Sequence, residues 1–218
     1  MVRTEPITQI ANAGRLDRRN LCRAVLADRG GLLVIAGLGA PAWDISAVGD
    51  CPENLPLWGG MGGAAMLGLG LALAQPTRRV LVVTGDGEML MGMGALATIA
   101  VKQPSNLAIL VLDNEHYGET GMQETHTKHG VDLVAIARGA GFKQALLVTR
   151  PEHVPPLRSV IHGEGLLFAL AKIDATSAEL VLPPRDGSFL QARMREAILG
   201  PQAHHQRGVG ALGGWRSR

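Results

Sequence analysis

The chain has 218 residues, of which 46% are hydrophobic and 18% are charged, and its formal net charge at pH 7 is +2. This size and composition allow one globular domain with a buried core, and they exclude a strongly basic face of the kind that binds DNA. Aromatic residues make up only 3% of the chain, so stacking surfaces for single-stranded nucleic acid are excluded as well.

Targeting signals and cysteine patterns narrow the class of protein further. No apolar stretch of the sequence reaches the length of a membrane span. The N-terminus lacks the apolar core of a signal peptide, so we expect a cytoplasmic protein without a membrane partner. Cys22 and Cys51 match no metal-ligand spacing and predict no disulfide framework.

The chain begins with a segment that shows no hydrophobic period. We expect residues 1–16 to form a mobile arm. Asp17 can cap a helix that runs to about Ala27. Residues 32–36 predict a short buried strand, which the loop Gly37-Leu38-Gly39 follows. The residues from Gly37 onward do not continue as Gly-x-Gly-x-x-Gly, so this loop does not predict a dinucleotide site.

The next segment is rich in glycine and other small residues. Residues 41–48 predict a turn of helix, and residues 50–56 predict a connecting loop. Residues 62–73 predict a helix whose small side chains allow it to press closely on a sheet. Trp58 and Met61 precede this helix, and one interpretation makes both of them core residues.

A strand–helix–strand unit occupies the middle of the chain. The run 80–84 predicts a strand that is buried on both faces, and Gly85 ends it. Residues 89–101 predict a helix and residues 107–112 a second buried strand. Such a crossover makes the two strands parallel, so Asp86 and Asn114 both emerge at the carboxyl edge of the sheet. Open α/β sheets bind their ligands at that edge.

The residues at this edge have the chemistry of a metal–diphosphate site. Asp86 offers a carboxylate oxygen, Asn114 offers an amide oxygen, and the loop after Asn114 can offer a main-chain carbonyl. Mg²⁺ prefers such oxygen ligands and completes its octahedron with phosphate and water. Gly85 and Gly87 leave room for a diphosphate, and the helix start that follows offers free N–H groups. The alternative is that both short motifs are ordinary turns.

The remaining elements complete one domain over residues 17–199. We expect a helix over 131–140, a strand over 144–148, an irregular helix from Pro151, a strand over 165–173 and a surface helix over 188–199. The composition of residues 200–218 predicts a flexible tail. The expected fold class is α/β, with a single doubly wound, mostly parallel sheet and helices on both faces.

Two motifs resemble those of thiamine diphosphate (ThDP)-dependent enzymes. The first is Gly85-Asp86-Gly87 with Asn114 placed 28 positions after Asp86. The second is the run PENLPLWGGMG at 52–62, with the small-residue helix after it. Residues 32–123 are most similar to the β subunits of sulfopyruvate decarboxylase and to the corresponding part of phosphonopyruvate decarboxylase. The run 120–123, TGMQ, resembles a TGGQ element of those enzymes, with Met122 at the second glycine.

The resemblance implies two cofactors, ThDP and Mg²⁺, and a set of residues that bind them. Mg²⁺ would be held by Asp86, by Asn114 and by the main-chain carbonyl of His116. The Gly59 carbonyl would accept a hydrogen bond from the 4′-amino group of the cofactor, and Met61 would bend the cofactor into a V shape. The expected cofactor-binding residues are Gly37, Gly39, Gly59, Met61, Gly85, Asp86, Gly87, Glu88, Met89, Asn114, His116, Tyr117, Gly118 and Glu119.

No residue of this chain is assigned a certain catalytic role, and four are possible substrate contacts. These are His116, Thr120, Gln123 and His126. The run His126-Thr127-Lys128-His129 has two histidines and no carboxylate, so we expect a mobile, solvated loop there rather than a metal site.

The resemblance also implies a partner chain. In this family the glutamate that activates the pyrimidine ring lies on a separate pyrimidine-binding domain, and no glutamate here matches its motif. We therefore expect an α-type subunit that supplies this glutamate, in a hetero-oligomer such as α2β2 or larger. The expected reaction is the decarboxylation of a 3-sulfo- or 3-phosphono-pyruvate-like 2-oxoacid, with the cofactor as electron sink.

Three other functions remain open: an acetolactate-synthase-like ligase, a 2-oxoacid oxidoreductase, and a non-catalytic diphosphate-binding module. Oxidoreductase β subunits of the ferredoxin-linked kind usually carry iron–sulfur cysteines, which this sequence lacks. The large synthases are single long chains. The absence of a Gly-Lys-Ser/Thr loop excludes the P-loop version of a binding module.

Overall fold

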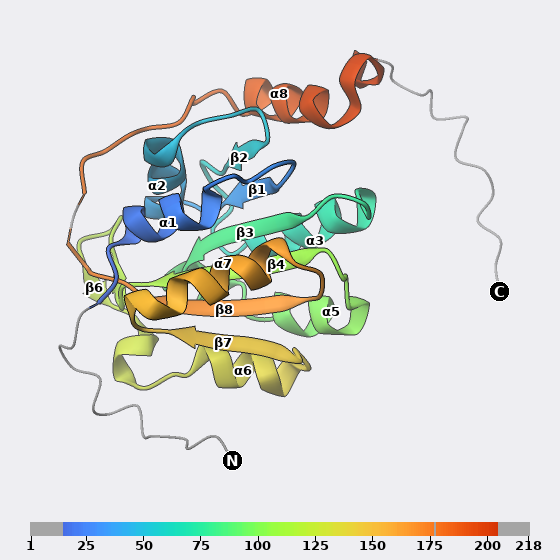
Figure 1. Ribbon diagram of the computed structural model, residues 1–218. Coiled ribbons are helices and arrows are strands. Elements are labelled where there is room, and N and C mark those ends of the chain that lie inside the picture. Colours follow the sequence, from blue (N-terminus) through green and yellow to red (C-terminus); the bar gives the residue numbers. More distant parts are fainter. Residues whose placement is uncertain (1–14, 177, 205–218) are drawn as a thin grey trace.

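The computed structural model describes residues 15–176 and 178–204 (Figure 1). Most of the predicted N-terminal arm and most of the predicted tail lie outside these ranges. Within them, Leu16 is buried and pairs with Ile173 in an isolated parallel bridge. The expectation of a mobile arm therefore does not hold for Leu16, because its side chain joins the core. Residues 200–204, at the start of the predicted tail, form a 3₁₀ turn, η4 (Gly200–His204).

The architecture is one six-stranded parallel sheet between two layers of helices (Figure 1). The strands lie in the order β2-β1-β3-β4-β8-β7, and every neighbouring pair is parallel. Their bounds are β1 Leu33–Ala36, β2 Asn54–Pro56, β3 Val80–Gly85, β4 Leu107–Asp113, β7 Gln144–Val148 and β8 Leu167–Lys172. The doubly wound α/β fold expected from the sequence is confirmed.

Alternation along the strands builds two separate cores, one on each face of the sheet. Leu33 and Ile35 of β1 belong to one hydrophobic cluster, whereas Val34 and Ala36 belong to the other. The first cluster is covered by α3 (Ala64–Ala74), α5 (Ala95–Lys102) and α6 (Leu133–Ala140), and the second by α1 (Arg18–Leu26), α2 (Ala40–Val48) and α7 (Val154–His162). Because both faces are covered, β1 is wholly apolar and β3 and β4 are apolar up to their carboxyl ends, as the run 80–84 predicts.

The neighbouring strands β1 and β3 form a topological switch point. The helix that follows β1 is α2, which packs on one face of the sheet. The helices that follow β3 are α4 (Asp86–Met91) and α5, and α5 packs on the opposite face. Open α/β sheets bind ligands at the carboxyl ends of strands where the winding reverses in this way. The loop 37–39 and the Gly85-Asp86-Gly87 triplet lie there.

Two predicted elements differ from the observed ones. The segment predicted as a loop over 50–56 ends in β2, whose backbone adds the outermost strand beside β1. The single helix predicted over 89–101 is two helices, α4 and α5, separated at Gly92. A Cβ on Gly92 would lie 2.1 Å from the carbonyl oxygen of Gly62, so this close backbone contact requires glycine. The break therefore has two causes, the close packing at Gly92 and the low helix propensity of glycine.

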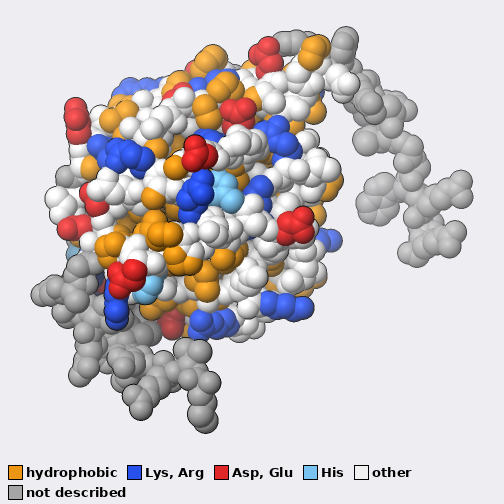
Figure 2. All heavy atoms as spheres, in the orientation of Figure 1, with side chains coloured by type: hydrophobic (Ala, Val, Ile, Leu, Met, Phe, Trp, Pro, Cys, Tyr) orange, Lys and Arg blue, Asp and Glu red, His pale blue; other side chains and the backbone are white. Residues whose placement is uncertain are grey.

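The C-terminal part of the described chain closes the β2 edge of the sheet. After β8 the chain runs along the carboxyl edge to α8 (Gly187–Leu199), which packs beside β2 (Figure 1). An ion pair of 2.5 Å between Arg193 of α8 and Asp50, shortly before β2, holds α8 in this place. Acidic and basic side chains are interspersed on the face shown in Figure 2. No helix within the described ranges combines the length and apolar character that crossing a membrane requires.

Candidate functional site

Asp86 is buried at the end of β3 and is held by two threonine hydroxyls. Asp86 is only 2% exposed. Its Oδ2 accepts hydrogen bonds from Thr125 Oγ1 at 2.5 Å and from Thr127 Oγ1 at 3.2 Å. Burial and the neighbouring Asp113 carboxylate raise the pKa of Asp86 to about 6. No salt bridge joins Asp86 to a basic side chain among the described residues.

The next carboxylate along this edge, Asp113, already has a cationic partner. Its Oδ2 lies 2.7 Å from Lys172 Nζ, at the end of the adjacent strand β8. Its Oδ1 accepts from Thr127 Oγ1 at 2.8 Å and from the backbone N–H of Glu115 at 3.0 Å. Asp113 is thus neutralised by its neighbours, whereas Asp86 is hydrogen-bonded but not charge-paired. A buried carboxylate of that kind favours a bound cation.

Asn114 and His116 form a tight turn directly after β4. The Oδ1 of Asn114 accepts from the backbone N–H of His116 at 3.0 Å, and His116 Nδ1 lies 2.8 Å from the Asn114 carbonyl. This bond to an N–H identifies Oδ1 as the oxygen of the amide, and a second lone pair remains on it.

The carbonyl of His116 lies on the side of its strand away from the hairpin partner. The strand β5 (His116–Tyr117) pairs with β6 (Gln123–Glu124), and Thr125 N–H donates to the Glu115 carbonyl at 2.9 Å. Because bonded and non-bonded pairs alternate in an antiparallel ladder, His116 is a non-bonded position. Its N–H, which donates to Asn114 Oδ1, and its carbonyl therefore both point away from β6.

These contacts bring the predicted metal ligands to one edge of the sheet. Thr127 Oγ1 bridges the carboxylates of Asp86 and Asp113, so the end of β4 lies within two hydrogen bonds of the start of α4. The donors at this edge are a carboxylate without a cationic partner, an amide oxygen and a main-chain carbonyl. That set fits Mg²⁺, which takes few protein oxygens and keeps positions for phosphate and water.

Glu88 joins the loop 37–39 to the end of β3 at the switch point. Its Oε2 accepts from Thr84 Oγ1 at 2.8 Å and from the backbone N–H of Leu38 at 3.1 Å. A Cβ on Gly37 would lie 1.9 Å from the same oxygen, so glycine is needed for this approach. The other oxygen, Oε1, is buried without a hydrogen-bond partner among the described residues. Such an atom is normally satisfied by water or by a ligand.

Other predicted diphosphate-binding residues have mixed surroundings. Gly85 has open space where a Cβ would stand, as the prediction requires. Gly87 does not, because a Cβ there would lie 2.5 Å from the Tyr117 ring. The missing side chain of Gly87 therefore makes room for the Tyr117 ring, and a diphosphate contact through the Gly87 backbone stays a prediction. The Met89 side chain is buried in the core, so only its backbone is left for a cofactor.

The exposed turn that joins β5 to β6 reaches the loop after β1. Gly118 and Glu119 are exposed, and the Glu119 carboxylate would lie 2.6 Å from a Cβ on Gly39, which has φ +78°. Burial of part of its side chain raises the pKa of Glu119. Met122 also has a positive φ, of 62°. That left-handed conformation is the reason a glycine suits this position in the TGGQ element.

The segment predicted to hold the cofactor rings is partly open. Gly59 has open space within 4 Å of the place where a Cβ would stand, and Met61 is half-buried. Trp58 is 38% exposed, so the core interpretation is wrong for it. Its Nε1 donates to the Pro184 carbonyl at 2.7 Å, and the Arg185 guanidinium lies over its ring.

Three of the four possible substrate contacts, Thr120, Gln123 and His126, are exposed, and His116 is half-buried. Thr120 and Gln123 bond to each other, with Thr120 Oγ1 donating to Gln123 Oε1 at 2.8 Å. His126 and His129 flank a short 3₁₀ helix, η2 (His126–His129), and both are exposed. The described residues contain no group of three or more His, Cys, Asp or Glu side chains that could hold a metal. The expectation of a fully solvated loop is nevertheless wrong, because Thr127 is buried against the two aspartates.

Four polar residues at the centre of the site are missing from the sequence prediction. They are Asp113, Thr125, Thr127 and Lys172. The sequence carries a signal for one of them. It carries none for Thr125 and Thr127, because Thr127 lies in the 3₁₀ helix η2 and a spacing of two predicts a shared side only in an extended segment. Lys172 is a lone cation that ends an apolar strand at the ligand-binding edge.

Comparisons with known proteins identify the family. The family model described as "Thiamine pyrophosphate enzyme, C-terminal TPP binding domain" matches residues 52–168. Sulfopyruvate decarboxylase subunit beta from Methanothermobacter thermautotrophicus is 42% identical over 77% of this chain and 88% of that protein. Phosphonopyruvate decarboxylase from Streptomyces viridochromogenes is 35% identical over 69% of this chain and 36% of that protein.

Solved structures agree on the fold. Benzoylformate decarboxylase from Polynucleobacter necessarius superposes with a TM-score of 0.63 at 18% identity, covering 82% of this chain and 36% of that one. This similarity concerns the fold alone. Together with the family model and the subunit relatives, the site geometry leads to one conclusion: the chain belongs to the thiamine pyrophosphate enzymes, and residues 52–168 contain its C-terminal TPP-binding domain.

Proposed function

We propose that this chain is the diphosphate- and Mg²⁺-binding subunit of a ThDP-dependent decarboxylase that acts on a 3-sulfo- or 3-phosphono-pyruvate-like 2-oxoacid. The observation that carries the proposal is the buried carboxylate of Asp86, which has no cationic partner among the described residues and which Thr127 links to Asp113, the residue before Asn114. The names of the relatives, which are decarboxylases of sulfopyruvate and phosphonopyruvate, support the substrate class.

The residues of this chain would bind and orient the cofactor. Asp86, Asn114 and the His116 carbonyl would hold Mg²⁺, which in turn would bind the diphosphate. The loop 37–39, which the Glu88 carboxylate ties to β3, would present its backbone to the same group. When bound, the thiazolium ring supplies the electron sink for the carbanion that remains after CO₂ leaves.

An apolar surface supports the partner subunit in this proposal. The sequence of α3, AAMLGLGLALA, has no polar residue, although Met66, Leu67 and Leu73 are exposed. A helix that is hydrophobic all round is normally buried. Two further exposed methionines, Met91 and Met93, lie where α4 ends.

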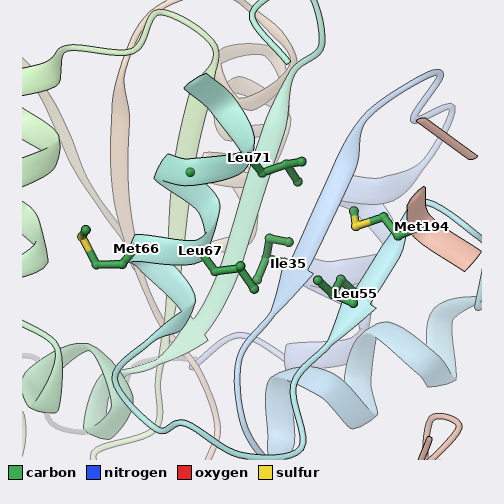
Figure 3. Close-up of a pocket in the computed structure, with 7 residues that line it drawn as sticks. Ile35, Leu55, Met66, Leu67, Leu71 and Met194 are labelled. Atoms are coloured by element: carbon green, nitrogen blue, oxygen red, sulfur yellow. The ribbon is translucent and has the colours of Figure 1, made fainter. Parts of the chain in front are cut away.

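A groove continues this surface toward α8. It has a volume of about 260 Å³. Leu67 and Leu71 of α3 face Leu55 and Met194 across it, and Met66 of the same helix also belongs to its lining (Figure 3). Exposed apolar side chains that gather on one face are typical of a protein–protein contact.

The partner would be an α-type subunit with a pyrimidine-binding domain. The chain covers 88% of the subunit relative but only 36% of phosphonopyruvate decarboxylase, so the longer relative contains a large additional part within one chain. In a hetero-oligomer such as α2β2, a separate subunit would provide that part, including the glutamate that activates the cofactor.

The test is reconstitution with the product of a neighbouring gene. The chain is co-expressed with the candidate α subunit, and 2-oxoacids are screened for CO₂ release in the presence of ThDP and Mg²⁺. We expect release from sulfopyruvate or phosphonopyruvate by the complex only, and none by the complex with Asp86→Ala. Full activity of this chain alone would contradict the two-subunit assignment. Release from pyruvate with acetolactate as product would favour the ligase alternative.

A matched pair of variants tests the proposed contact surface. Leu73→Glu places a charge on the exposed face of α3 and should prevent co-purification with the partner. Leu147→Glu places the same charge on an exposed leucine of β7, at the opposite edge of the sheet, and should leave assembly unchanged. Co-purification of both variants would show that the α3 face is not the contact.

A further inference from the structure

Thr125 and Thr127 come from a segment 39 and 41 residues beyond Asp86, yet both lie against its carboxylate. Thr125 is 0% exposed and Thr127 is 5% exposed. Both hydroxyls contact the same oxygen, Oδ2, and neither contacts Oδ1. The two oxygens of this carboxylate are therefore in different surroundings.

The protons of the two hydroxyls have a defined distribution. Each threonine has one proton to donate. The shortest contact of Thr125 is to Asp86 Oδ2 at 2.5 Å, and the shortest contact of Thr127 is to Asp113 Oδ1 at 2.8 Å. Lys172 fixes Asp113 in turn. Thr125 thus donates to Asp86, and Thr127 donates to Asp113, so that the 3.2 Å approach of Thr127 to Asp86 Oδ2 is a contact without a proton. Thr127 Oγ1 also lies 2.9 Å from Thr125 Oγ1, which places Thr125 beside a charge-balanced aspartate.

We propose that Thr125 and Thr127 are positioning residues that make Asp86 a one-oxygen ligand and so favour Mg²⁺ over Ca²⁺. The inference rests on the proposed function, in which Asp86 binds the metal. With Oδ2 engaged by the Thr125 hydroxyl, Oδ1 is the oxygen of this carboxylate that is left for a cation. Mg²⁺ needs single oxygens at about 2.0–2.1 Å in an octahedron, whereas Ca²⁺ accepts both oxygens of one carboxylate and six to eight ligands.

The test compares Thr125→Val with Thr125→Ser in the assembled enzyme. Valine keeps the branched shape and removes the hydroxyl, while serine keeps the hydroxyl. The readout is the dissociation constant of each metal, Mg²⁺ and Ca²⁺, obtained by calorimetry from the metal dependence of ThDP binding. Thr98→Val, on the exposed side of α5, is the matched control.

For Thr125→Val we expect Mg²⁺ affinity to fall by about 10- to 100-fold, the usual effect of losing a residue that orients a metal ligand. Ca²⁺ affinity should fall less, so that the preference for Mg²⁺ decreases by about tenfold. Thr125→Ser and the Thr98→Val control should keep the wild-type preference. If the hydroxyl has a purely structural role, its loss would weaken the binding of both metals equally.

An unchanged Mg²⁺/Ca²⁺ preference in Thr125→Val would overturn the inference. If that variant does not fold, Thr127→Val decides: it removes the longer contact to Asp86, and we expect a smaller change of preference in the same direction. A wild-type preference in Thr127→Val would then overturn the inference. Metal-dependent ThDP binding that survives Asp86→Ala would instead overturn the proposed metal site itself.

Discussion

Replacing Asp86 by asparagine should stabilise the metal-free chain while it abolishes metal binding. The wild-type carboxylate is buried, lies near a second carboxylate and has no cationic partner among the described residues. Its ionised form is therefore disfavoured in the folded state. Asparagine has nearly the same shape and still accepts the hydrogen bond from Thr125, but it carries no charge.

The magnitude follows from the pKa of this group. Burial and the Asp113 carboxylate raise the pKa of Asp86 from an ordinary value of 3.8 to about 6. At about 1.4 kcal/mol for each pH unit, the cost of ionising Asp86 in the fold is about 3 kcal/mol. The folded state binds this proton more tightly than the unfolded state, so the cost is absent below pH 4, grows between pH 4 and 6, and is complete above pH 6.

The assay is urea unfolding without metal at pH 4 and pH 7.5. Asp86→Asn should exceed wild type by about 3 kcal/mol in unfolding free energy at pH 7.5, with little difference at pH 4. Adding Mg²⁺ and ThDP should then stabilise wild type but not the variant. If Asp86→Asn is less stable than wild type at pH 7.5, the carboxylate is stabilising and our account of the site fails.

Three further predictions concern the scaffold. Gly68→Ala should destabilise the fold by about 1–3 kcal/mol, because the new Cβ would lie 2.2 Å from a valine methyl of β3. Gly70→Ala on the same helix has open space and should stabilise the fold by about 0.5–1 kcal/mol. Thermal unfolding measures both changes. Burial raises the pKa of the Cys22 thiol, so a thiol reagent at pH 8 should label Cys51 first and Cys22 only on unfolding; early labelling of Cys22 would contradict its burial. Burial alone would raise the pKa of Glu115, but hydrogen bonds from a lysine and an arginine lower it to about 2. Glu115→Gln should therefore be less stable than wild type above pH 4.5, and this difference should disappear as the pH falls toward 2; a difference that grows toward low pH would refute the ion-pair assignment.

The sheet and its order of elements could be predicted from the sequence because local signals agree with the fold. The apolar run 80–84 is buried on both faces, and Asp17 caps α1 by accepting from the Asn20 N–H. The segment 54–56 could not be predicted as a strand. It is only three residues long and contains a proline, and its place is set by pairing with β1 rather than by its own propensity.

The site could be predicted only where it coincides with a local motif. Asp86 and Asn114 follow buried strands, so their place at the ligand-binding edge follows from connectivity alone. Thr125 and Lys172 reach the same place through loops and a distant strand, and their contacts depend on the packed structure. Gly87 illustrates the reverse case: its motif predicts ligand contact, but the ring of Tyr117, from a later segment of the chain, fills the space.

The backbone contact between Gly62 and Gly92 has a consequence for how this protein can evolve. Since no side chain separates the two stretches of backbone, the proposed ring-binding segment lies in direct contact with the end of the helix that begins at Asp86. A larger residue at Gly92 would push these segments apart and change the distance between the two ends of any molecule that spans them. Residues near Asp86 can therefore change in evolution only if the substitution keeps this spacing.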